Sequence, residues 1–306
     1  MTATILSETV LPHLPSASGV EIVGTTAYVV SDDAPYLYLL DAATLAPAGQ
    51  VQLFETTDFG TGRIPKATKP DLESMAAAVG PAGVAGLLLC GSGSRPNRDV
   101  GYYVALPNAE APLGSAPPHT ATQRLDLHPL YMQLRAHLAA GVVLNIEAAA
   151  TTATELLLLQ RSVGGGPALL FALPLAATLA QLFDPRCVVP AVARVLSFQL
   201  PVLEGYAAGF SGATFVDGQL LVTASVEATA DAVADGAMLG SFVGVVNLVD
   251  QTAAFARLAW ADGRAYLGKV EGLAVRRTHS PGRLELLLVT DDDLGGSTAL
   301  VAEVRL

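Results

Sequence analysis

Five short segments of the sequence share a pattern in which an acidic or hydroxyl residue is followed by small and apolar residues. The clearest copy, at 269–275, reads Lys-Val-Glu-Gly-Leu-Ala-Val. The pattern recurs at intervals of roughly 60 residues, a period typical of a closed or stacked array of structural repeats. The central residues of the copies, called the marker residues below, are Ser18, Glu73, Glu147, Ser211 and Glu271.

The marker residues could bind a metal ion. If each opens the innermost strand of its repeat, three carboxylates converge on one place and repel one another unless a cation lies among them. None of the five positions holds Lys, Arg, His or Cys, and a set of oxygen ligands at flexible geometry fits Ca²⁺ better than Mg²⁺ or Zn²⁺. We therefore expect Ca²⁺ as a cofactor, bound by all five marker residues. In the alternative, the glutamates only tie neighbouring strands together through hydrogen bonds to backbone amides.

The same kinds of element follow each marker residue. A strand-like apolar run, a polar turn and a further apolar run come after every copy, and in four copies a last run alternates apolar and polar residues as a half-exposed strand does. The fifth copy lacks this run because the sequence ends at Leu306, whereas residues 5–11 precede the first copy and have no other partner. An amino-terminal strand that pairs with residues 299–304 would close the ring.

The sequence thus predicts an all-β fold, a five-bladed β-propeller of four-stranded antiparallel blades that is closed by the amino-terminal strand in the last blade. Short helices are expected at 130–138 and 176–183, where apolar residues recur at helical spacing. We expect a single domain over residues 1–306, with blades at about 18–54, 70–128, 144–200, 209–260 and 268–306 plus 4–11.

Composition excludes several classes of partner. The net charge of −11 argues against nucleic acid and against an anionic membrane surface. No apolar run reaches the ~20 residues that span a bilayer. The amino terminus lacks the basic start and apolar stretch of a secretory signal, so we expect a cytoplasmic protein, with a secreted one as the alternative if a leader has been removed from this sequence. The G-x-S-x-G, Walker and H-E-x-x-H motifs are absent from the sequence.

Charged loops beside the marker residues form a second candidate site. In an up-and-down blade, the connector entering the inner strand and the turn leaving the second strand lie on the same face of the ring. On that face the first and fifth blades present Asp32, Asp33, Asp291, Asp292 and Asp293, and the second and third present Arg63, Lys66, Lys69, Arg95, Arg98 and Arg161.

These two groups suggest acid–base chemistry on an anionic small-molecule substrate. A phosphate or carboxylate group would be held by the basic side chains while the acids position water or a second metal. The candidate catalytic residues are Asp32, Asp33 and Asp292. The candidate substrate-binding residues are Lys66, Lys69, Arg95 and Arg161, and Arg63 and Arg98 are expected to be surface charges. Ordinary solvated loop charge is the alternative interpretation of the whole group.

The marker order Ser, Glu, Glu, Ser, Glu resembles that of the calcium-activated nucleotidases, or apyrases. Gly209-Phe210-Ser211 and the run Tyr-Val-Val-Ser-Asp-Asp at 28–33 add to the resemblance, which covers the whole chain in spacing but only short motifs in identity. It implies a five-bladed propeller with an axial calcium ion at the five marker residues and hydrolysis of nucleoside di- and triphosphates. In that family an Arg-Thr-Gly turn follows the acidic pair, whereas Ala34-Pro35-Tyr36 stands here. The Glu-Gly and Asp-Asp-Asp motifs also resemble the phytase-like esterases.

Two function classes follow from these observations. The first is a calcium-centred propeller that hydrolyses a phosphate ester or anhydride at the mouth of its channel. The second is a non-catalytic propeller in which the ion is structural and the faces serve as a binding or interaction module. A calcium titration with a panel of phosphate substrates distinguishes the two.

Overall fold

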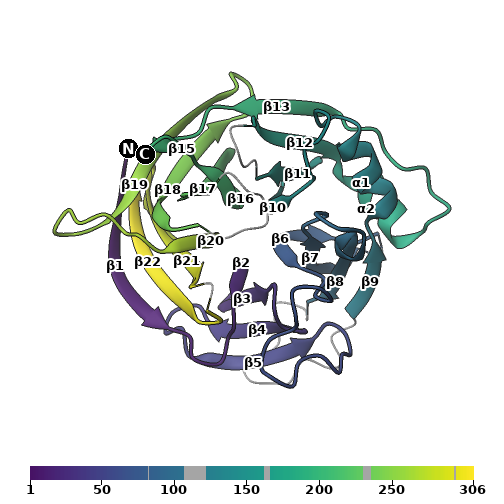
Figure 1. Cartoon of the computed structure of the whole chain (residues 1–306), viewed down its shortest axis with the longest axis horizontal. Coiled ribbons are helices and arrows are strands. Elements are labelled where there is room, and N and C mark those ends of the chain that lie inside the picture. Colours follow the sequence, from purple (N-terminus) through teal and green to yellow (C-terminus); the bar gives the residue numbers. More distant parts are fainter. Residues whose placement is uncertain (82, 107–121, 162–165, 230–235, 293) are drawn as a thin grey trace.

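In the computed structural model, the described residues are 1–81, 83–106, 122–161, 166–229, 236–292 and 294–306. Within them the chain is almost entirely β-structure, with its sheets arranged around a central axis (Figure 1). The strands nearest that axis are β2 (Ala17–Val23), β6 (Leu72–Val79), β10 (Ile146–Thr151), β16 (Gly209–Val216) and β20 (Lys269–Ser280). Each contacts the next around the ring, and β20 contacts β2 again. The inner strands therefore enclose the axis.

Three sheets have four antiparallel strands each, in chain order from the axis outward. The first is β2 with β3 (Thr26–Ser31), β4 (Tyr36–Asp41) and β5 (Pro47–Gln52). The second is β6 with β7 (Ala85–Gly91), β8 (Val100–Ala105) and β9 (Thr122–Asp126). The third is β10 with β11 (Glu155–Gln160), β12 (Ala168–Pro174) and β13 (Arg194–Phe198).

The remaining large sheet has eight strands in the order β16-β17-β18-β19-β1-β22-β21-β20. Its other members are β17 (Gln219–Glu227), β18 (Met238–Asn247), β19 (Thr252–Trp260), β1 (Thr2–Val10), β22 (Ser297–Arg305) and β21 (Arg283–Asp291). The expected antiparallel pairing of the amino-terminal strand with residues 299–304 is present, since Ile5 lies opposite Ala302 and Thr9 opposite Ala299. An additional parallel pairing joins β1 to β19.

Short elements lie between the sheets. They are η1 (Pro96–Arg98), α1 (His128–Arg135), α2 (Leu175–Phe183) and the hairpin of β14 (Val202–Leu203) with β15 (Tyr206–Ala207). Both predicted helices are confirmed, although α1 begins earlier than expected because Pro129 is tolerated in a first turn, where its missing N–H has no helical partner. None of the helices described is long and apolar enough to cross a membrane.

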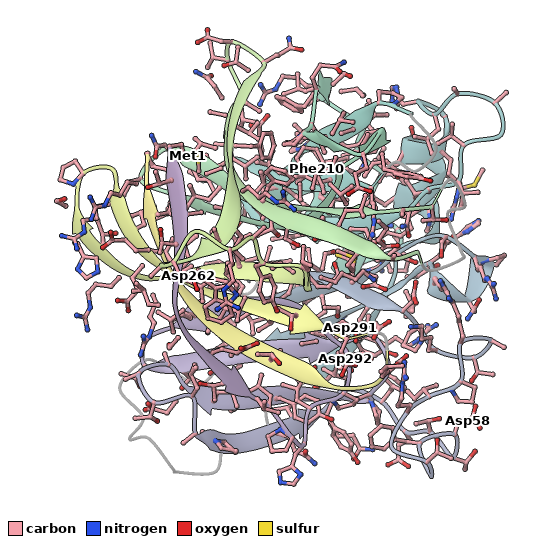
Figure 2. The ribbon with its side chains drawn as sticks, turned by 60° about the vertical axis from the view of Figure 1, so that its left-hand side comes forward. Met1, Asp58, Phe210, Asp262, Asp291 and Asp292 are labelled. Atoms are coloured by element: carbon pink, nitrogen blue, oxygen red, sulfur yellow. The ribbon has the colours of Figure 1, made fainter. Side chains whose placement is uncertain are left out.

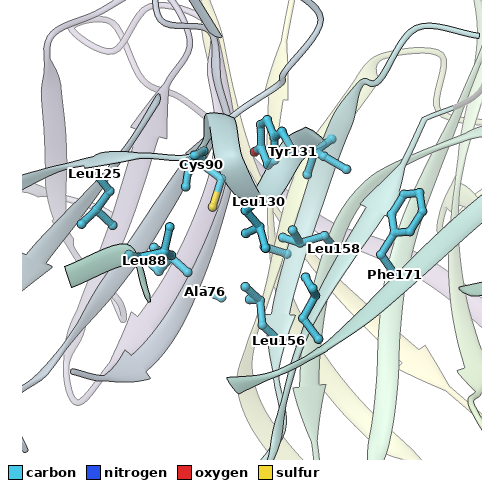
Figure 3. Packing of buried hydrophobic residues seen from close by; sticks show 14 of the residues in the cluster. Ala76, Leu88, Cys90, Leu125, Leu130, Tyr131, Leu156, Leu158 and Phe171 are labelled. Atoms are coloured by element: carbon cyan, nitrogen blue, oxygen red, sulfur yellow. The ribbon is translucent and has the colours of Figure 1, made fainter. Parts of the chain in front are cut away.

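Apolar residues fill the space between adjacent sheets and hold the inner strands in place. Between the second and third sheets, Leu88, Leu158 and Phe171 are fully buried, and α1 inserts Tyr131 above them (Figure 3). The Tyr131 hydroxyl donates a hydrogen bond of 2.6 Å to the carbonyl of Gly91. A buried phenol needs such a partner. The hydrogen bond therefore holds α1 against Gly91, the last residue of β7.

Candidate functional site

Each marker residue lies at a β-bulge in its inner strand. Ala17 pairs with Ser31 and Gly19 with Val30, which leaves Ser18 without a partner on β3. The same break in register falls on Glu73, Glu147, Ser211 and Glu271. A bulge bends the strand and re-aims the extra side chain. The repeated sequence pattern therefore marks a repeated change of side-chain direction beside the axis.

The small residues that follow the markers are explained by close approach of the inner strands. A Cβ added to Gly212 would lie 2.9 Å from the Cα of Gly272, and one added to Gly272 would lie 2.9 Å from the Cα of Gly19. Non-bonded carbon atoms do not approach so closely. Only glycine therefore permits β2, β16 and β20 to come together directly after their marker residues. The resulting channel is narrow.

Four of the five markers border this channel. Ser18, Glu73, Glu147 and Glu271 line a pocket there together with the small and apolar residues that follow them. The Ser18 hydroxyl donates to the carbonyl of Leu72 at 2.5 Å and so ties β2 to β6. The Ser211 hydroxyl instead lies 3.2 Å from Thr223 Oγ1, within its own sheet. Ser18 thus ties two inner strands through a backbone carbonyl, whereas the strand-tie alternative concerned the glutamates and backbone amides.

Arg161 and Lys269 bring positive charge to the marker glutamates. Arg161 Nη1 lies 3.2 Å from Glu147 Oε2 and 3.8 Å from Glu271 Oε1, and its Nη2 bonds to Glu227. Lys269 Nζ lies 2.8 Å from Glu271 Oε1 and 3.5 Å from Glu227 Oε1. We call these five residues the arginine cluster. The sequence argument assigns the counter-charge of the converging glutamates to a metal ion. For Glu147 and Glu271, side chains from outside the five marker sites supply positive charge, because Arg161 reaches both glutamates and Lys269 reaches Glu271.

Burial governs the protonation of the arginine cluster. It raises the pKa of Glu271 to about 8, with help from the charge of Glu147 and against Lys269 and Arg161. Burial would also raise the pKa of Glu227, but Arg161 and Lys269 outweigh it and hold that pKa below its usual value. Arg161 was expected on the rim as a substrate ligand; its side chain is only 11% exposed, and its guanidinium is directed to these carboxylates.

A second group of charges lies between the first and second sheets. Lys69 Nζ lies 3.0 Å from Asp33 Oδ1 and 3.2 Å from Asp71 Oδ1, and it also bonds to Asp32 Oδ2. Arg63 Nε donates to Asp33 Oδ2 at 2.6 Å, and Arg98 Nη1 donates to Asp71 Oδ2 at 2.6 Å. These six residues are called the lysine cluster. They show that the acidic and basic loops expected on one face do meet, and that they largely neutralise each other.

The prediction of surface roles for Arg63 and Arg98 needs correction. Arg98 is only 6% exposed because η1 turns it inward onto Asp71. The Arg63 side chain is 41% exposed, but it is anchored on Asp33. Both arginines therefore belong to the lysine cluster.

Asp32 and Glu73 are the least compensated acids of the site. Asp32 Oδ1 is buried without a hydrogen-bond partner, and burial together with the charges of Asp33 and Asp71 raises the pKa of Asp32 to about 7 despite Lys69. Burial and the charges of Asp32, Asp71 and Glu147 raise the pKa of Glu73 well above its usual value. Within the described residues, no hydrogen bond or ion pair reaches the Glu73 carboxylate. By contrast, Lys69 and Arg63 overcome the effect of burial and lower the pKa of Asp33.

The predicted calcium site is divided between the two clusters. Glu147 and Glu271 are fully engaged by cationic side chains. Asp32 and Asp71 also have cationic partners, in Lys69 and Arg98, but within the described residues Asp32 Oδ1 and the Glu73 carboxylate do not. Asp32, Asp71 and Glu73 each offer one oxygen, and these oxygens lie within 4.8 Å of one another. Ligands at 2.3–2.6 Å from one Ca²⁺ ion lie at most about 5 Å apart, so these three carboxylates fit a hard cation. A full set of five marker ligands does not fit as well, since Glu147 and Glu271 would have to leave Arg161 and Lys269.

The other predicted site residues lie outside the two clusters. Asp292, beyond the end of β21, is exposed and stabilises a turn, because its Oδ1 accepts hydrogen bonds from the N–H groups of Leu294 and Gly296 (Figure 2). Arg95 and Lys66 are exposed, next to the segments that carry Arg98 and Lys69. Asp293 lies outside the described residues.

Three charged residues of the two clusters, Asp71, Glu227 and Lys269, were not predicted to be site residues from the sequence. Two of them have a signal in the sequence, since Asp71 and Lys269 stand two residues before a marker glutamate. The same offset gives Asn145, whose side-chain amide donates to Glu147 Oε1 at 2.6 Å. Asp71 and Asn145 immediately precede their inner strands and Lys269 opens its own, so each lies beside the bulge that carries the marker glutamate. The position two before each marker could thus have been identified as its partner.

Glu21, farther along β2, is a partly buried acid that the sequence pattern does not single out. Burial raises its pKa from 4.5 to about 8, against a hydrogen bond with the backbone of Ala77. Between these two pH values the folded chain keeps a proton that the unfolded chain loses, so the stability of the fold decreases as pH rises.

Glu21→Gln should remove this contribution. The parent should lose stability relative to the variant between pH 5 and pH 8, by at most about 1.4 kcal/mol per pH unit. Urea unfolding of both proteins across this range measures the difference. Parallel pH profiles would show that Glu21 is ionised in the folded state.

Comparison with known proteins adds the fold and the family. The search of the curated proteins found no match. The glutaminyl cyclase of Myxococcus xanthus is similar over 100% of this chain and 97% of its own, with 12% identity and a TM-score of 0.51. The PQQ-bound aldose sugar dehydrogenase of Streptomyces coelicolor matches over 98% of both chains, with 14% identity and a TM-score of 0.42.

At such low identity, the likeness to the cyclase shows a propeller-like all-β fold and nothing about activity. The cyclase is neither an apyrase nor a phytase-like esterase, so the propeller-like fold is the part of the sequence resemblance that it supports. Residues 13–304 match the family of unknown function DUF6929, and the chain belongs to that family.

Proposed function

We propose that this chain is a five-bladed propeller that binds a divalent cation, Ca²⁺, and hydrolyses a phosphate ester or anhydride at the mouth of its channel. One observation carries the proposal. Asp32, Asp71 and Glu73 each offer an oxygen within 4.8 Å of the others, and in the described structure Asp32 Oδ1 is buried with no donor. A buried carboxylate oxygen without a partner is costly unless a cation or a proton satisfies it.

Five blades are inferred by dividing the eight-stranded sheet between β19 and β1. The parallel contact of these strands joins only Ala3 to Ile5 with Leu258 to Trp260, whereas β1 pairs with β22 along its whole length. A bulge with a marker residue also occurs in each of β2, β6, β10, β16 and β20. Each inner strand then begins one blade.

The charge balance favours a divalent ion. The lysine cluster with Glu73 combines three cations with the carboxylates of Asp32, Asp33, Asp71 and Glu73. The arginine cluster combines two cations with three carboxylates. Each group thus carries one excess negative charge when all acids are ionised, and burial makes that charge costly.

The acids of the lysine cluster divide the acid–base work. A bound Ca²⁺ would polarise a phosphoryl oxygen and make a coordinated water more acidic. Without an ion the pKa of Asp32 is about 7. A bound Ca²⁺ would lower it, so Asp32 would be ionised near neutral pH and could accept a proton from the coordinated water as a general base. Asp33 stays ionised because Lys69 and Arg63 hold it, and it keeps Lys69 in position beside Asp32. Neighbouring acids with pKa values pushed apart are typical of acid–base catalysts.

Lys66 and Arg95 are the basic residues best placed to meet an anionic substrate. Both are exposed, and both adjoin the buried cluster, because Arg98 donates to the carbonyl of Lys66 at 3.1 Å and Arg95 immediately precedes η1. Lys69 and Arg161 act indirectly, by fixing the acids.

A second candidate, the non-catalytic binding module, is favoured by the internal ion pairs of Lys69 and Arg161. The sequence assigned both side chains to substrate, and both are instead enclosed by carboxylates. If no residue can contact a phosphate group inside the channel, the ion is structural and the faces of the ring bind a partner.

Asp32→Asn tests the choice between these functions. With Ca²⁺ and substrates such as p-nitrophenyl phosphate and ATP, we expect the variant to lose at least about 100-fold in kcat/KM, the usual contribution of a general base. Asp58→Asn, an equivalent change at an exposed loop position (Figure 2), should retain parent activity. Calcium binding by calorimetry without hydrolysis of any phosphate substrate would support the binding module, and absence of both would reject the metal centre as well.

A further inference from the structure

We infer that Arg161, assisted by Lys269, is a resident cation that takes the place of a metal ion among the carboxylates of Glu147, Glu227 and Glu271. The marker pattern assigns Glu147 and Glu271 to a calcium ion, and the contacts around them disagree with that assignment. This inference concerns residues other than Asp32, Asp71 and Glu73, and it does not depend on the proposed function.

One guanidinium joins carboxylates from three strands. Arg161 follows β11, and its two terminal nitrogens reach Glu147 on β10, Glu227 at the end of β17 and Glu271 on β20. A metal ion on the axis would make the same kind of contact, with oxygens converging from several blades. Arginine can do so because its planar fork presents several donors in fixed directions.

The path of the Arg161 side chain is built into the fold. Its backbone N–H donates to the carbonyl of Asn145 at 2.9 Å, which fixes the point where the side chain leaves the sheet. A Cβ added to Gly209 would lie 2.5 Å from Arg161 Cγ. Glycine at the start of β16 therefore provides the space through which the side chain reaches the axis.

Charge makes the guanidinium and a metal ion mutually exclusive here. Arginine stays protonated at all ordinary pH values, and the surrounding glutamates raise the pKa of Arg161 further even though burial opposes them. Lys269 adds a second positive charge at 2.8 Å from Glu271. Every glutamate of the arginine cluster has a cationic partner, whereas Glu73 has none within the described residues. A divalent ion within reach of the same oxygens would therefore compete with both cations, lie only a few ångströms from them and be strongly repelled.

Removal of the guanidinium should therefore create a calcium site. Three buried carboxylates would remain with Lys269 alone, and an all-oxygen set of this kind binds Ca²⁺. Parent and Arg161→Met proteins, both first treated with chelator, are titrated with CaCl₂ by calorimetry and melted with and without the ion. We expect the variant to bind one more Ca²⁺ than the parent, whatever number the parent binds. Its Tm should be lower than that of the parent in chelator and should rise more with Ca²⁺.

Further variants keep the inference separate from the proposed catalytic site. In an Asp32→Asn background, the additional Ca²⁺ caused by Arg161→Met should persist. Arg161→Lys keeps a cation and should bind the same number of ions as the parent. An additional ion in Arg161→Lys, or an unchanged number in Arg161→Met, would overturn the inference. If Arg161→Met folds only when Ca²⁺ is present, the ion has replaced the lost charge; if it fails to fold even at saturating Ca²⁺, the inference is wrong.

Discussion

Replacement of Lys69 by methionine should lower the free energy of unfolding by about 3–5 kcal/mol, the usual cost of removing one partner from a buried ion pair. The Lys69 side chain is only 8% exposed, and its ammonium group is shared by Asp32, Asp33 and Asp71. Methionine preserves the length of the side chain but leaves these carboxylates with Arg63 and Arg98 alone. The loss should therefore arise from electrostatics rather than from a cavity.

The pH dependence of this loss distinguishes the two causes. Lys69 lowers the pKa of Asp33, so it contributes stability that is present above the unfolded value of 3.8 and is lost as pH falls through the lower folded value. The difference between parent and variant should be largest above pH 7. It should shrink as pH falls through about 7, where Asp32 takes up a proton, and shrink further below about pH 4 as Asp33 becomes protonated. Urea unfolding at several pH values measures it.

Arg186→Met serves as the matched control for Lys69→Met. Arg186 pairs with Asp184, but its side chain is 89% exposed, so its removal should leave stability unchanged within error. A loss in Lys69→Met that stays constant with pH would contradict the electrostatic account, and a loss as small as that of the control would show that the cluster is solvated.

The repeated elements of the fold could be predicted from local sequence. Alternating runs locate the strands. The marker pattern locates the inner strands, because each marker lies at a bulge and the residues after it must be small where neighbouring inner strands approach closely, as at Gly212 and Gly272. The pairing of β1 with β22 followed from counting strands. Its parallel pairing with β19 did not, because an apolar pattern specifies which face of a strand is buried and not which second neighbour it meets.

The partners of the acids were harder to predict. Arg161 lies 14 residues from Glu147 and 66 from Glu227 in sequence, and only the closed ring brings all three together. Arg98 was predicted to be an exposed loop charge. Its burial depends on the turn of η1 and on its ion pair with Asp71, which lies 27 residues away in the sequence. Composition and spacing identified where charges gather, but ion pairing depends on side-chain directions that emerge only when neighbouring sheets pack.

Deletion of residues 1–10 should abolish folding of the isolated chain. These residues contain β1, which is hydrogen-bonded to β22 along its whole length and to β19 at Ala3 to Ile5, and the side chains of Ala3 and Ile5 are 4% and 2% exposed. Loss of about 1 kcal/mol per ladder hydrogen bond and about 2 kcal/mol for Ile5 sums to on the order of 5–10 kcal/mol, comparable to the whole stability of a typical domain. Thermal melting and light scattering should show an unfolded or aggregated chain, since two strand edges become exposed.

A synthetic peptide of residues 1–12 provides the decisive comparison, because an added strand can complete an open sheet edge through backbone hydrogen bonds. The peptide should restore a cooperative melt to the truncated chain, and the midpoint should rise with peptide concentration. Its Ile5→Asp form should fail, because that side chain enters the core, whereas its Leu6→Asp form should succeed, because Leu6 is 55% exposed at the bulge of β1. If the truncated chain melts at the parent temperature without any peptide, the eight-stranded sheet does not depend on β1, and the ring must be held at this seam by the loops and inner strands alone.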